Sequence, residues 1–101
     1  MKKIIDFKNR VYHLVAKIPK GKVSTYKIIA NKLNCRAYRA VGNVLNKNKD
    51  RNVPCRRVVK SNGDIGGFAF GAKKKIELLK KEGIKIKNKK IQNFSKVLCR
   101  F

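Results

Sequence analysis

Residues 24–47 read STYKIIANKLNCRAYRAVGNVLNK and contain two short segments with the apolar spacing of a helix. In the first, Ser24 or Thr25 can cap a helix whose apolar side chains share one face, namely Tyr26, Ile29, Ala30 and Leu33. The second follows a brief turn, and its apolar face is made by Ala37, Ala40, Val41, Val44 and Leu45. Its opposite face carries Arg36, Arg39, Asn43 and Lys47. Two short helices with a tight turn between them, the second basic on one side, are typical of a helix-turn-helix.

The residues before this pair predict a further amphipathic helix over roughly residues 3–18, because apolar side chains recur there at steps of three and four. These apolar side chains are Ile4, Phe7, Val11, Leu14 and Ile18. Pro19 and Gly21 follow and are expected to end the helix.

The residues after the pair indicate less regular structure. Asn46–Asn52 predicts a loop, and the apolar run 53–59 followed by Asn62-Gly63 predicts a small hairpin or wing. Residues 72–82 predict a last helix that Gly83 ends. We therefore expect a mainly α, winged helix-turn-helix-like domain with a small β hairpin or sheet element over residues 1–83. We expect the basic extension 84–101 to pack on the same domain.

Composition limits what this chain can be. It has 101 residues, with 28 Lys+Arg against 5 Asp+Glu, so its formal charge is +23, while 43% of the residues are hydrophobic. These figures exclude a multidomain enzyme and disfavour a disordered basic tail. No apolar run approaches the roughly 20 residues of a membrane span, and no signal peptide is visible, so we expect a cytoplasmic protein without membrane contact. The charge predicts attraction to nucleic acid, although part of it can be solvated lysine.

The cysteines argue against a metal site or a disulfide framework. Cys35, Cys55 and Cys99 are odd in number, far apart and without a C-x-x-C pair, so we expect reduced thiols, no metal and no cofactor. Cys55 follows Pro54 and precedes Arg56 and Arg57. Nearby guanidinium charge favours a thiolate, the reactive form, whereas a free cysteine is more often a small buried apolar residue.

Several motifs together resemble the O6-alkylguanine-DNA alkyltransferases, also called methylated-DNA–protein-cysteine methyltransferases. Their order and spacing match over residues 18–83, and together they are far more specific than any one of them. The motifs are Ile18-Pro19-x-Gly21, Ser24-x-Tyr26, Arg39-Ala40-Val41-Gly42, Asn48, Pro54-Cys55-x-Arg57-Val58-Val59, Gly66-Gly67 and Glu82-Gly83. The resemblance is to the carboxy-terminal, catalytic and DNA-binding domain of longer family members, so we expect this chain to be that domain only.

The resemblance implies a DNA repair protein that flips O6-alkylguanine out of duplex DNA through the minor groove. It then transfers the alkyl group irreversibly to its own Cys55, once per molecule. Extrusion is needed because the reacting carbon is out of reach inside the stack. Arg39 resembles the arginine that fills the vacated space, and Tyr26 the tyrosine that crowds the phosphate and donates to the departing guanine. Asn48 resembles the hinge asparagine before the cysteine loop. From the residues alone, the lesser alternatives are that Arg39 is a phosphate contact, Tyr26 a core aromatic and Asn48 a turn residue.

The resemblance also implies two larger sets of contacts, with double-stranded DNA as the partner and no obligate protein partner. The base pocket would be lined by Leu45, Val58, Ile65, Gly66, Gly67, Phe68 and Ala69. DNA would be contacted by Thr25, Tyr26, Lys27, Arg36, Ala37, Arg39, Ala40, Gly42, Asn43, Lys47, Lys60 and Ser61. The alanines and Gly42 can equally serve packing alone.

The sequence departs from the family beside the cysteine. The family's Pro-Cys-His-Arg is here Pro-Cys-Arg-Arg, so Arg56 stands in place of a histidine that takes the thiol proton. Arginine cannot act as that base near neutral pH. Our hypothesis is that Arg56 stabilises a standing thiolate, with Glu82 paired to it. Phe68 and Ala69 also replace Tyr-Ser, which removes hydroxyls, and the loop before Cys55 is shorter than in the family.

Two alternatives remain open at this point. The first is an alkyltransferase-like protein that binds O6-alkylguanine without transfer; such relatives lack the cysteine, so Cys55 argues for transfer while Arg56 argues mildly against it. The second is a basic architectural or ribosomal protein, which accounts for the lysines but not for the motif around Cys55.

Overall fold

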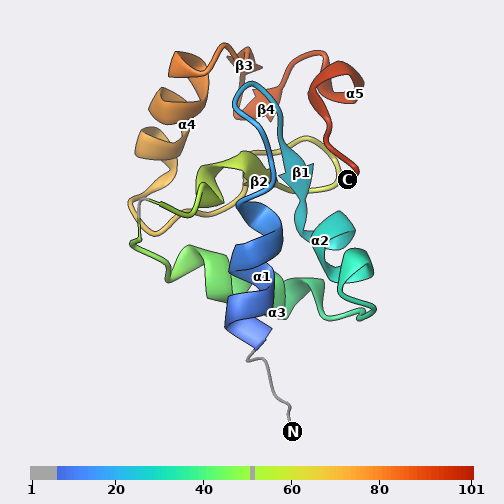
Figure 1. The fold of residues 1–101 in the computed structure, drawn as a ribbon. Helices are drawn as coiled ribbons and strands as arrows, with labels where there is room; N and C mark the ends of the chain where they lie inside the picture. The colour runs from blue at the N-terminus through green and yellow to red at the C-terminus, as the bar shows by residue number, and fades with distance from the viewer. Residues whose placement is uncertain (1–6, 51) are drawn as a thin grey trace, which may run out of the picture.

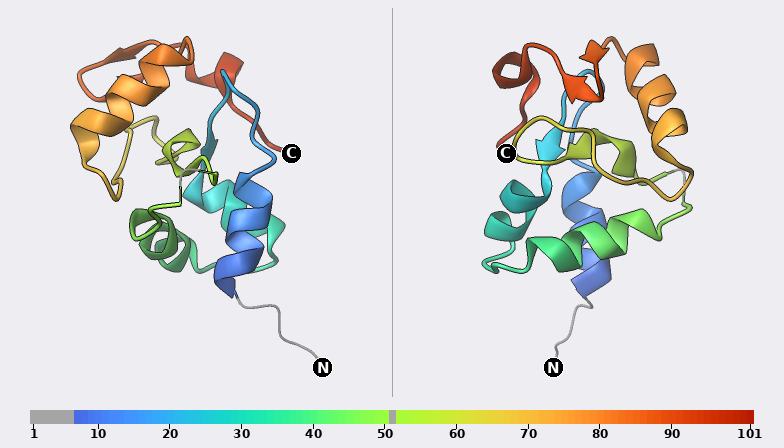
Figure 2. Two further views of the ribbon diagram at one scale, coloured as in Figure 1. Left: turned by 60° about the vertical axis from the view of Figure 1, so that its left-hand side comes forward. Right: turned by 180° about the vertical axis from the view of Figure 1, so that it is seen from behind.

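A computed structural model describes residues 7–50 and 52–101 of the chain. In chain order the elements are α1 (Phe7–Val15), β1 (Ser24–Thr25), α2 (Tyr26–Lys32), α3 (Tyr38–Asn46), a 3-10 turn η1 (Cys55–Arg57), β2 (Val58–Val59), α4 (Ala72–Lys81), β3 (Ile86–Lys87), β4 (Lys90–Ile91) and α5 (Phe94–Val97). Figures 1 and 2 show α1, α2 and α3 gathered at one end of the molecule and α4, β3, β4 and α5 at the other, with β1 and β2 between them. The predicted mainly helical class with a small β element is confirmed. None of the helices in the described ranges has the length and apolar character of a membrane span.

The amino-terminal helix is shorter than the periodicity predicts. α1 ends at Val15, and the chain then tightens into a turn in which the amide of Ile18 donates to the carbonyl of Val15 at 3.0 Å. This turn still brings Ile18 into the core beside Val11 and Val15. The predicted positions 3–6 lie outside the described residues.

The helix-turn-helix lies where it was predicted. The Thr25 hydroxyl accepts from the amide of Ile28 at 3.0 Å, so Thr25, and not Ser24, is the cap of α2. Asn34, with a φ of 57°, reverses the chain after α2. Helix α3 then buries Val41 and Leu45 and leaves its basic face in solvent. The Thr25 cap and the buried side chains of Val41 and Leu45 therefore fix the two helices.

The predicted hairpin around residues 53–68 is wrong. Val58 and Val59 pair in parallel with Ser24 and Thr25, so the strand partner comes from the start of the helix-turn-helix. The Asn62-Gly63 turn does form, closed by the amide of Lys60 donating to the carbonyl of Asp64 at 2.9 Å. Within residues 7–50 and 52–101 the antiparallel hairpin lies in the extension, where β3 pairs with β4. Isolated two-residue strands carry too little alternation for their partners to be predicted from sequence.

The core consists of two clusters that meet at β2. Val58 belongs to the cluster under α1, α2 and α3, which also contains Cys55, while Val59 belongs to the cluster under α4. Successive residues of a strand face opposite sides, so this short strand contributes to both. The extension adds Ile84 and Ile91 to the second cluster, and Cys99 donates its amide to the carbonyl of Val23 at 2.6 Å. The Cys55 turn therefore lies at the junction of the two halves.

Candidate active site

The Cys55 thiol is buried and held by one neighbouring side chain. Cys55 is only 5% exposed, at the start of η1, and its amide donates to the carbonyl of Val53 at 2.8 Å. Asn48 Nδ2 donates to Cys55 Sγ at 2.8 Å and also to the carbonyl of Asp50 at 3.2 Å. Asn48 Oδ1 accepts from the amide of Asp50 at 3.1 Å. Asn48 thus fixes the loop after α3 and the sulfur at its far end.

Glu82 gathers both arginines that follow the cysteine. Arg56 Nε and Nη2 donate to Glu82 Oε2 at 2.9 and 2.7 Å, and Arg57 Nε and Nη2 donate to Oε1 and Oε2 at 2.9 and 2.8 Å. The Glu82 side chain is 8% exposed. Burial alone would raise the pKa of Glu82, but the hydrogen bonds from Arg57 and Arg56 outweigh it and lower that pKa. The predicted pairing of Glu82 with Arg56 is present.

The hypothesis of a standing thiolate is not supported. Burial raises the pKa of the Cys55 thiol above its ordinary value, against the hydrogen bond from Asn48 and the charges of Lys75 and Arg56. The guanidinium of Arg56 is directed to Glu82, which neutralises much of its field at the sulfur. Desolvation therefore dominates, and Cys55 rests as a thiol near neutral pH.

Lys75 is a functional candidate that the sequence reasoning missed. It is 0% exposed, and its Nζ donates to the carbonyls of Val58 and Gly67 at 2.7 and 2.9 Å and to the Tyr26 hydroxyl at 3.5 Å. Burial lowers the pKa of Lys75 to about 7, although nearby Cys55 and Asp64 oppose this shift. Lys75 precedes Leu79 by four residues, so it lies on the apolar face of α4. The sequence signal for this residue is a lysine at a position where helical spacing predicts an apolar side chain.

Tyr26 connects this buried lysine to the glycines that follow β2. Its hydroxyl donates weakly to the carbonyl of Gly67 at 3.5 Å, and burial raises the pKa of Tyr26 to about 12. A Cβ on Gly66, whose φ is 72°, would lie 2.8 Å from the Tyr26 hydroxyl oxygen, and one on Gly67 would lie 2.8 Å from Asn46 Nδ2. Glycine is therefore required at position 66, where φ is positive and the chain passes against Tyr26, whereas at position 67 the exposed Asn46 side chain could move aside.

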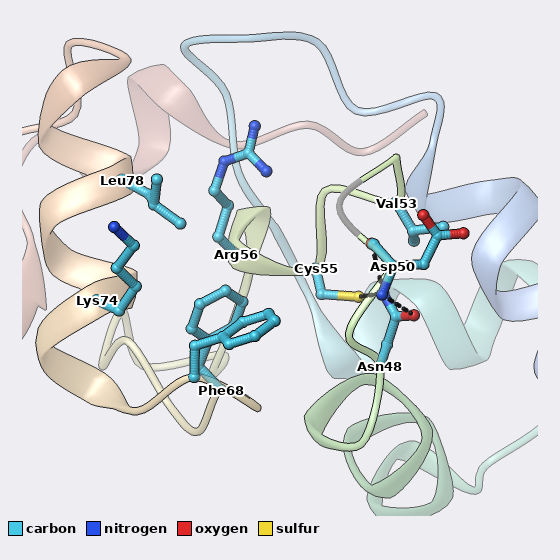
Figure 3. Close-up of a pocket in the computed structure, with 9 residues that line it drawn as sticks. Asn48, Asp50, Val53, Cys55, Arg56, Phe68, Lys74 and Leu78 are labelled. Carbon is cyan, nitrogen blue, oxygen red and sulfur yellow. Dashed lines mark hydrogen bonds between the residues drawn. The ribbon is translucent and has the colours of Figure 1, made fainter.

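A hollow of about 320 Å³ opens beside Cys55. Figure 3 shows Lys74 and Leu78 of α4 on one side, Cys55 and Asn48 on the other, and Phe68 between them. The ring of Phe68 meets that of Phe70 edge to face, 5.5 Å between centroids. The full lining is Asn48, Asp50, Val53, Cys55, Arg56, Phe68, Phe70, Lys74 and Leu78. A mostly apolar hollow with aromatic rings and a thiol in its wall suits an apolar or aromatic ligand that could react with the sulfur.

The predicted pocket set divides between this hollow and the core. Phe68 lines the hollow. Leu45, Val58 and Ile65 are instead buried in the two core clusters, because apolar side chains on α3 and on the segment after η1 face inward. Gly66 and Gly67 pass beside Tyr26 and Asn46, and Ala69 is half-buried in the same segment.

Most of the predicted DNA-contacting residues are exposed to solvent. Exposed members are Lys27, Arg36, Ala37, Arg39, Asn43, Lys47, Lys60 and Ser61. Ala40 and Gly42 are half-buried, and Thr25 is buried because its hydroxyl caps α2. A second hollow of about 500 Å³ opens on this face, lined by Tyr26, Lys27, Tyr38, Arg39, Lys60, Ser61 and Asn62. Tyr26 is thus the residue that joins the basic face to the interior beside Lys75.

Comparisons with known proteins agree with this geometry. Residues 6–84 match the family model of the 6-O-methylguanine DNA methyltransferase DNA binding domain. A methylated-DNA–protein-cysteine methyltransferase of Saccharolobus solfataricus is 48% identical over 85 residues, which are 83% of this chain and 55% of that protein. The chain thus spans about half the length of this relative.

Two solved structures extend the comparison to proteins bound to DNA. Mycobacterium tuberculosis OGT in complex with DNA has a TM-score of 0.73 at 34% identity, over 79% of this chain and 51% of that one. S. pombe Atl1, in complex with damaged DNA containing O6-carboxymethylguanine, has a TM-score of 0.85 at 28% identity, over 97% of this chain and 98% of that one.

Proposed function

This chain belongs to the 6-O-methylguanine DNA methyltransferase family, and from that premise we propose that it repairs DNA by moving the alkyl group of O6-alkylguanine onto its own Cys55. The observation that carries the proposal is the buried thiol of Cys55, hydrogen-bonded to Asn48 and facing a hollow beside a basic helix-turn-helix. We further propose that residues 6–84 correspond to the carboxy-terminal domain of longer relatives, and that the protein acts in the cytoplasm, where its free cysteines would stay reduced.

Recognition of the lesion begins at the exposed face. The cations of α2 and α3 would hold the phosphates of the duplex across the minor groove, and Arg39 would fill the space that the extruded nucleotide leaves. Extrusion costs least for a base that already pairs badly, and this difference favours the lesion over normal guanine. The extruded base would enter beside Tyr26 and come to rest in the hollow at Cys55.

Transfer is a single displacement. A lone pair of Cys55 Sγ attacks the alkyl carbon, the new S–C bond forms as the C–O6 bond breaks, and the electron pair leaves with guanine. The thiol proton must depart and the guanine must gain one, so the atoms balance without any further reactant. Tyr26 would donate toward the leaving base, where negative charge grows in the transition state. The thioether is stable, so each molecule would act once, as a methylated-DNA–protein-cysteine methyltransferase.

Lys75 would act as a positioning residue for this step. It joins the carbonyls of Val58 and Gly67 to the Tyr26 hydroxyl and thereby fixes the donor relative to the cysteine turn. With a pKa of about 7, Lys75 can also exchange a proton near neutral pH, a capacity that Arg56 lacks. We propose that Lys75, rather than Arg56 at the histidine's position, assists the departure of the thiol proton.

A second candidate function is lesion binding without transfer. It is favoured by the match to S. pombe Atl1 over nearly the whole of both chains, against 79% of this chain for the M. tuberculosis protein. The raised pKa of Cys55 also favours slow transfer. Retention of the cysteine itself, facing the hollow, is why transfer remains the preferred proposal.

One experiment separates these readings. The protein is incubated with a duplex containing O6-methylguanine, and intact mass and a peptide map are recorded, with Cys55→Ser as the test variant and Cys99→Ser as a matched control. A methyl group on Cys55 that persists in Cys99→Ser establishes transfer. Preference for the lesion without a mass change supports the binding protein, and equal binding of damaged and undamaged duplex rejects both.

A further inference from the structure

An exposed aromatic ring lies in the basic hollow of the helix-turn-helix. Among the described residues the large apolar side chains in solvent are Tyr38, Phe70 and Phe101, and Tyr38 is the most exposed at 49%. Phe70 lines the hollow at Cys55, while Tyr38 lines the hollow of about 500 Å³ on the basic face. A single exposed ring is common on a protein surface, but a ring in a hollow that three cations also line is placed to contact a ligand.

The chemistry of that hollow is specific. Its cations are Lys27, Arg39 and Lys60, and among the described residues that line it there is no carboxylate. Within the described part of the chain the charged side-chain groups of these residues make no hydrogen bond or ion pair, so their charge is available to a partner. Cations beside an exposed aromatic face are the combination that binds an unstacked base together with its phosphates.

Tyr38 directly precedes Arg39, the residue proposed to fill the space that the extruded nucleotide leaves. It is the first residue of α3, where its amide donates to the carbonyl of Arg36 at 2.9 Å, and Arg39 follows it. Successive side chains diverge by about 100° around a helix. Tyr38 and Arg39 nevertheless line the same hollow, so an arginine inserted into the stack would bring the neighbouring ring close to the opened base pair.

We propose that Tyr38 stacks on the base opposite the extruded nucleotide while Arg39 fills the vacated position and Lys27 and Lys60 hold the surrounding phosphates. The proposal rests on the proposed function, since it needs a duplex with one position vacated. An uncharged ring adds affinity that depends on an unstacked base and not on salt, whereas each lysine adds affinity for any duplex. Tyr38 would thus make the basic face selective for opened DNA.

The test uses a duplex in which 2-aminopurine faces an abasic site, because this DNA is already open and has no alkyl group to transfer. Binding of the wild-type protein is expected to quench the 2-aminopurine fluorescence. For Tyr38→Ala and Tyr38→Leu we expect the preference for this duplex over a continuous one to fall by about fivefold or more. Tyr38→Phe, which keeps the ring, should retain the preference, and Phe101→Ala is the control for an exposed aromatic outside the hollow.

Two results would overturn the proposal. One is a loss in Tyr38→Ala that is equal for the open and the continuous duplex, which would make Tyr38 a general contact. The other is a Tyr38→Leu variant that keeps both quenching and preference, which would show that bulk alone suffices. If the wild-type protein quenches the probe but never methylates Cys55, the proposed function fails while the stacking role of Tyr38 stands.

Discussion

The cysteine centre and the helix-turn-helix face use charge in opposite ways. At the centre, Glu82 and Lys75 are buried, and every charged group there has named partners within hydrogen-bond distance. On the face, Lys27, Arg39 and Lys60 are exposed. Buried charge is held strongly and fixes geometry, whereas exposed charge is screened by salt and contributes mainly to attraction. The net charge of +23 therefore says little about the chemistry, which depends on a few partnered groups.

The largest effect should come from Glu82→Gln. This change leaves Arg56 and Arg57 without their carboxylate in a mostly buried site, so we expect a loss of about 3 kcal/mol in the free energy of unfolding. Urea denaturation measures it. Glu77→Gln is the matched control, because Glu77 lies in α4 shortly before Glu82, has its ion pairs in solvent and should change stability far less. Equal losses of stability in Glu82→Gln and Glu77→Gln would contradict the difference between buried and exposed charge.

The next effect is a pH dependence that comes from Lys75. Its pKa is lowered to about 7 in the folded protein and is near 10.5 when unfolded, so between these values the unfolded chain binds the extra proton. Stability from this group therefore rises with pH across that window, by at most about 1.4 kcal/mol per unit. Between pH 7.5 and 9.5 we expect the free energy of unfolding of the protein with Lys75 to rise relative to that of the Lys75→Met variant. The comparison is made in a Cys55→Ser background, since the raised thiol pKa acts in the opposite direction.

A smaller loss is expected from Gly66→Ala. The φ of 72° and the 2.8 Å approach to the Tyr26 hydroxyl oxygen should together cost about 1–2 kcal/mol and displace the tyrosine. Gly42→Ala is the control, because a Cβ there meets the Tyr26 ring at an ordinary 3.8 Å and favours the helix. Thermal unfolding compares the two, and destabilisation by Gly42→Ala of the same size would refute the role of the close approach.

The smallest effect on stability should follow from Lys60→Gln, which changes an exposed residue by less than about 0.5 kcal/mol. Its effect appears in binding, where the slope of log affinity against log salt should fall by about 0.9 for one lost phosphate contact. Lys87→Gln, in the extension, tests whether that segment also reaches DNA. If Lys60→Gln left the slope unchanged, the basic face would not extend to the turn after β2.

Sequence patterns predicted what depends on local spacing. The helix-turn-helix, the Thr25 cap as one of two choices, the last helix and its Gly83 stop all follow from periodicity and capping within a few residues. The pairing of Val58-Val59 with Ser24-Thr25 did not, because it joins distant segments. Lys75 could not be singled out by residue type in a chain with so many lysines, and only its spacing from Leu79 on the apolar face of α4 marks it. The effect of Arg56 on the thiol was misjudged because both Glu82 and burial act against it.

The hydrogen bonds of Arg57 also bear on how the chain folds during synthesis. Arg57, while bound to Glu82, donates from Nη1 to the carbonyl of Ile18 at 2.8 Å, so three distant segments meet at one guanidinium. Contacts between distant segments close late, because the loop entropy must be overcome first. A ribosome releases residue 82 well after the helix-turn-helix has emerged. The helix-turn-helix can therefore be structured before the turn that carries Cys55 is fixed in place.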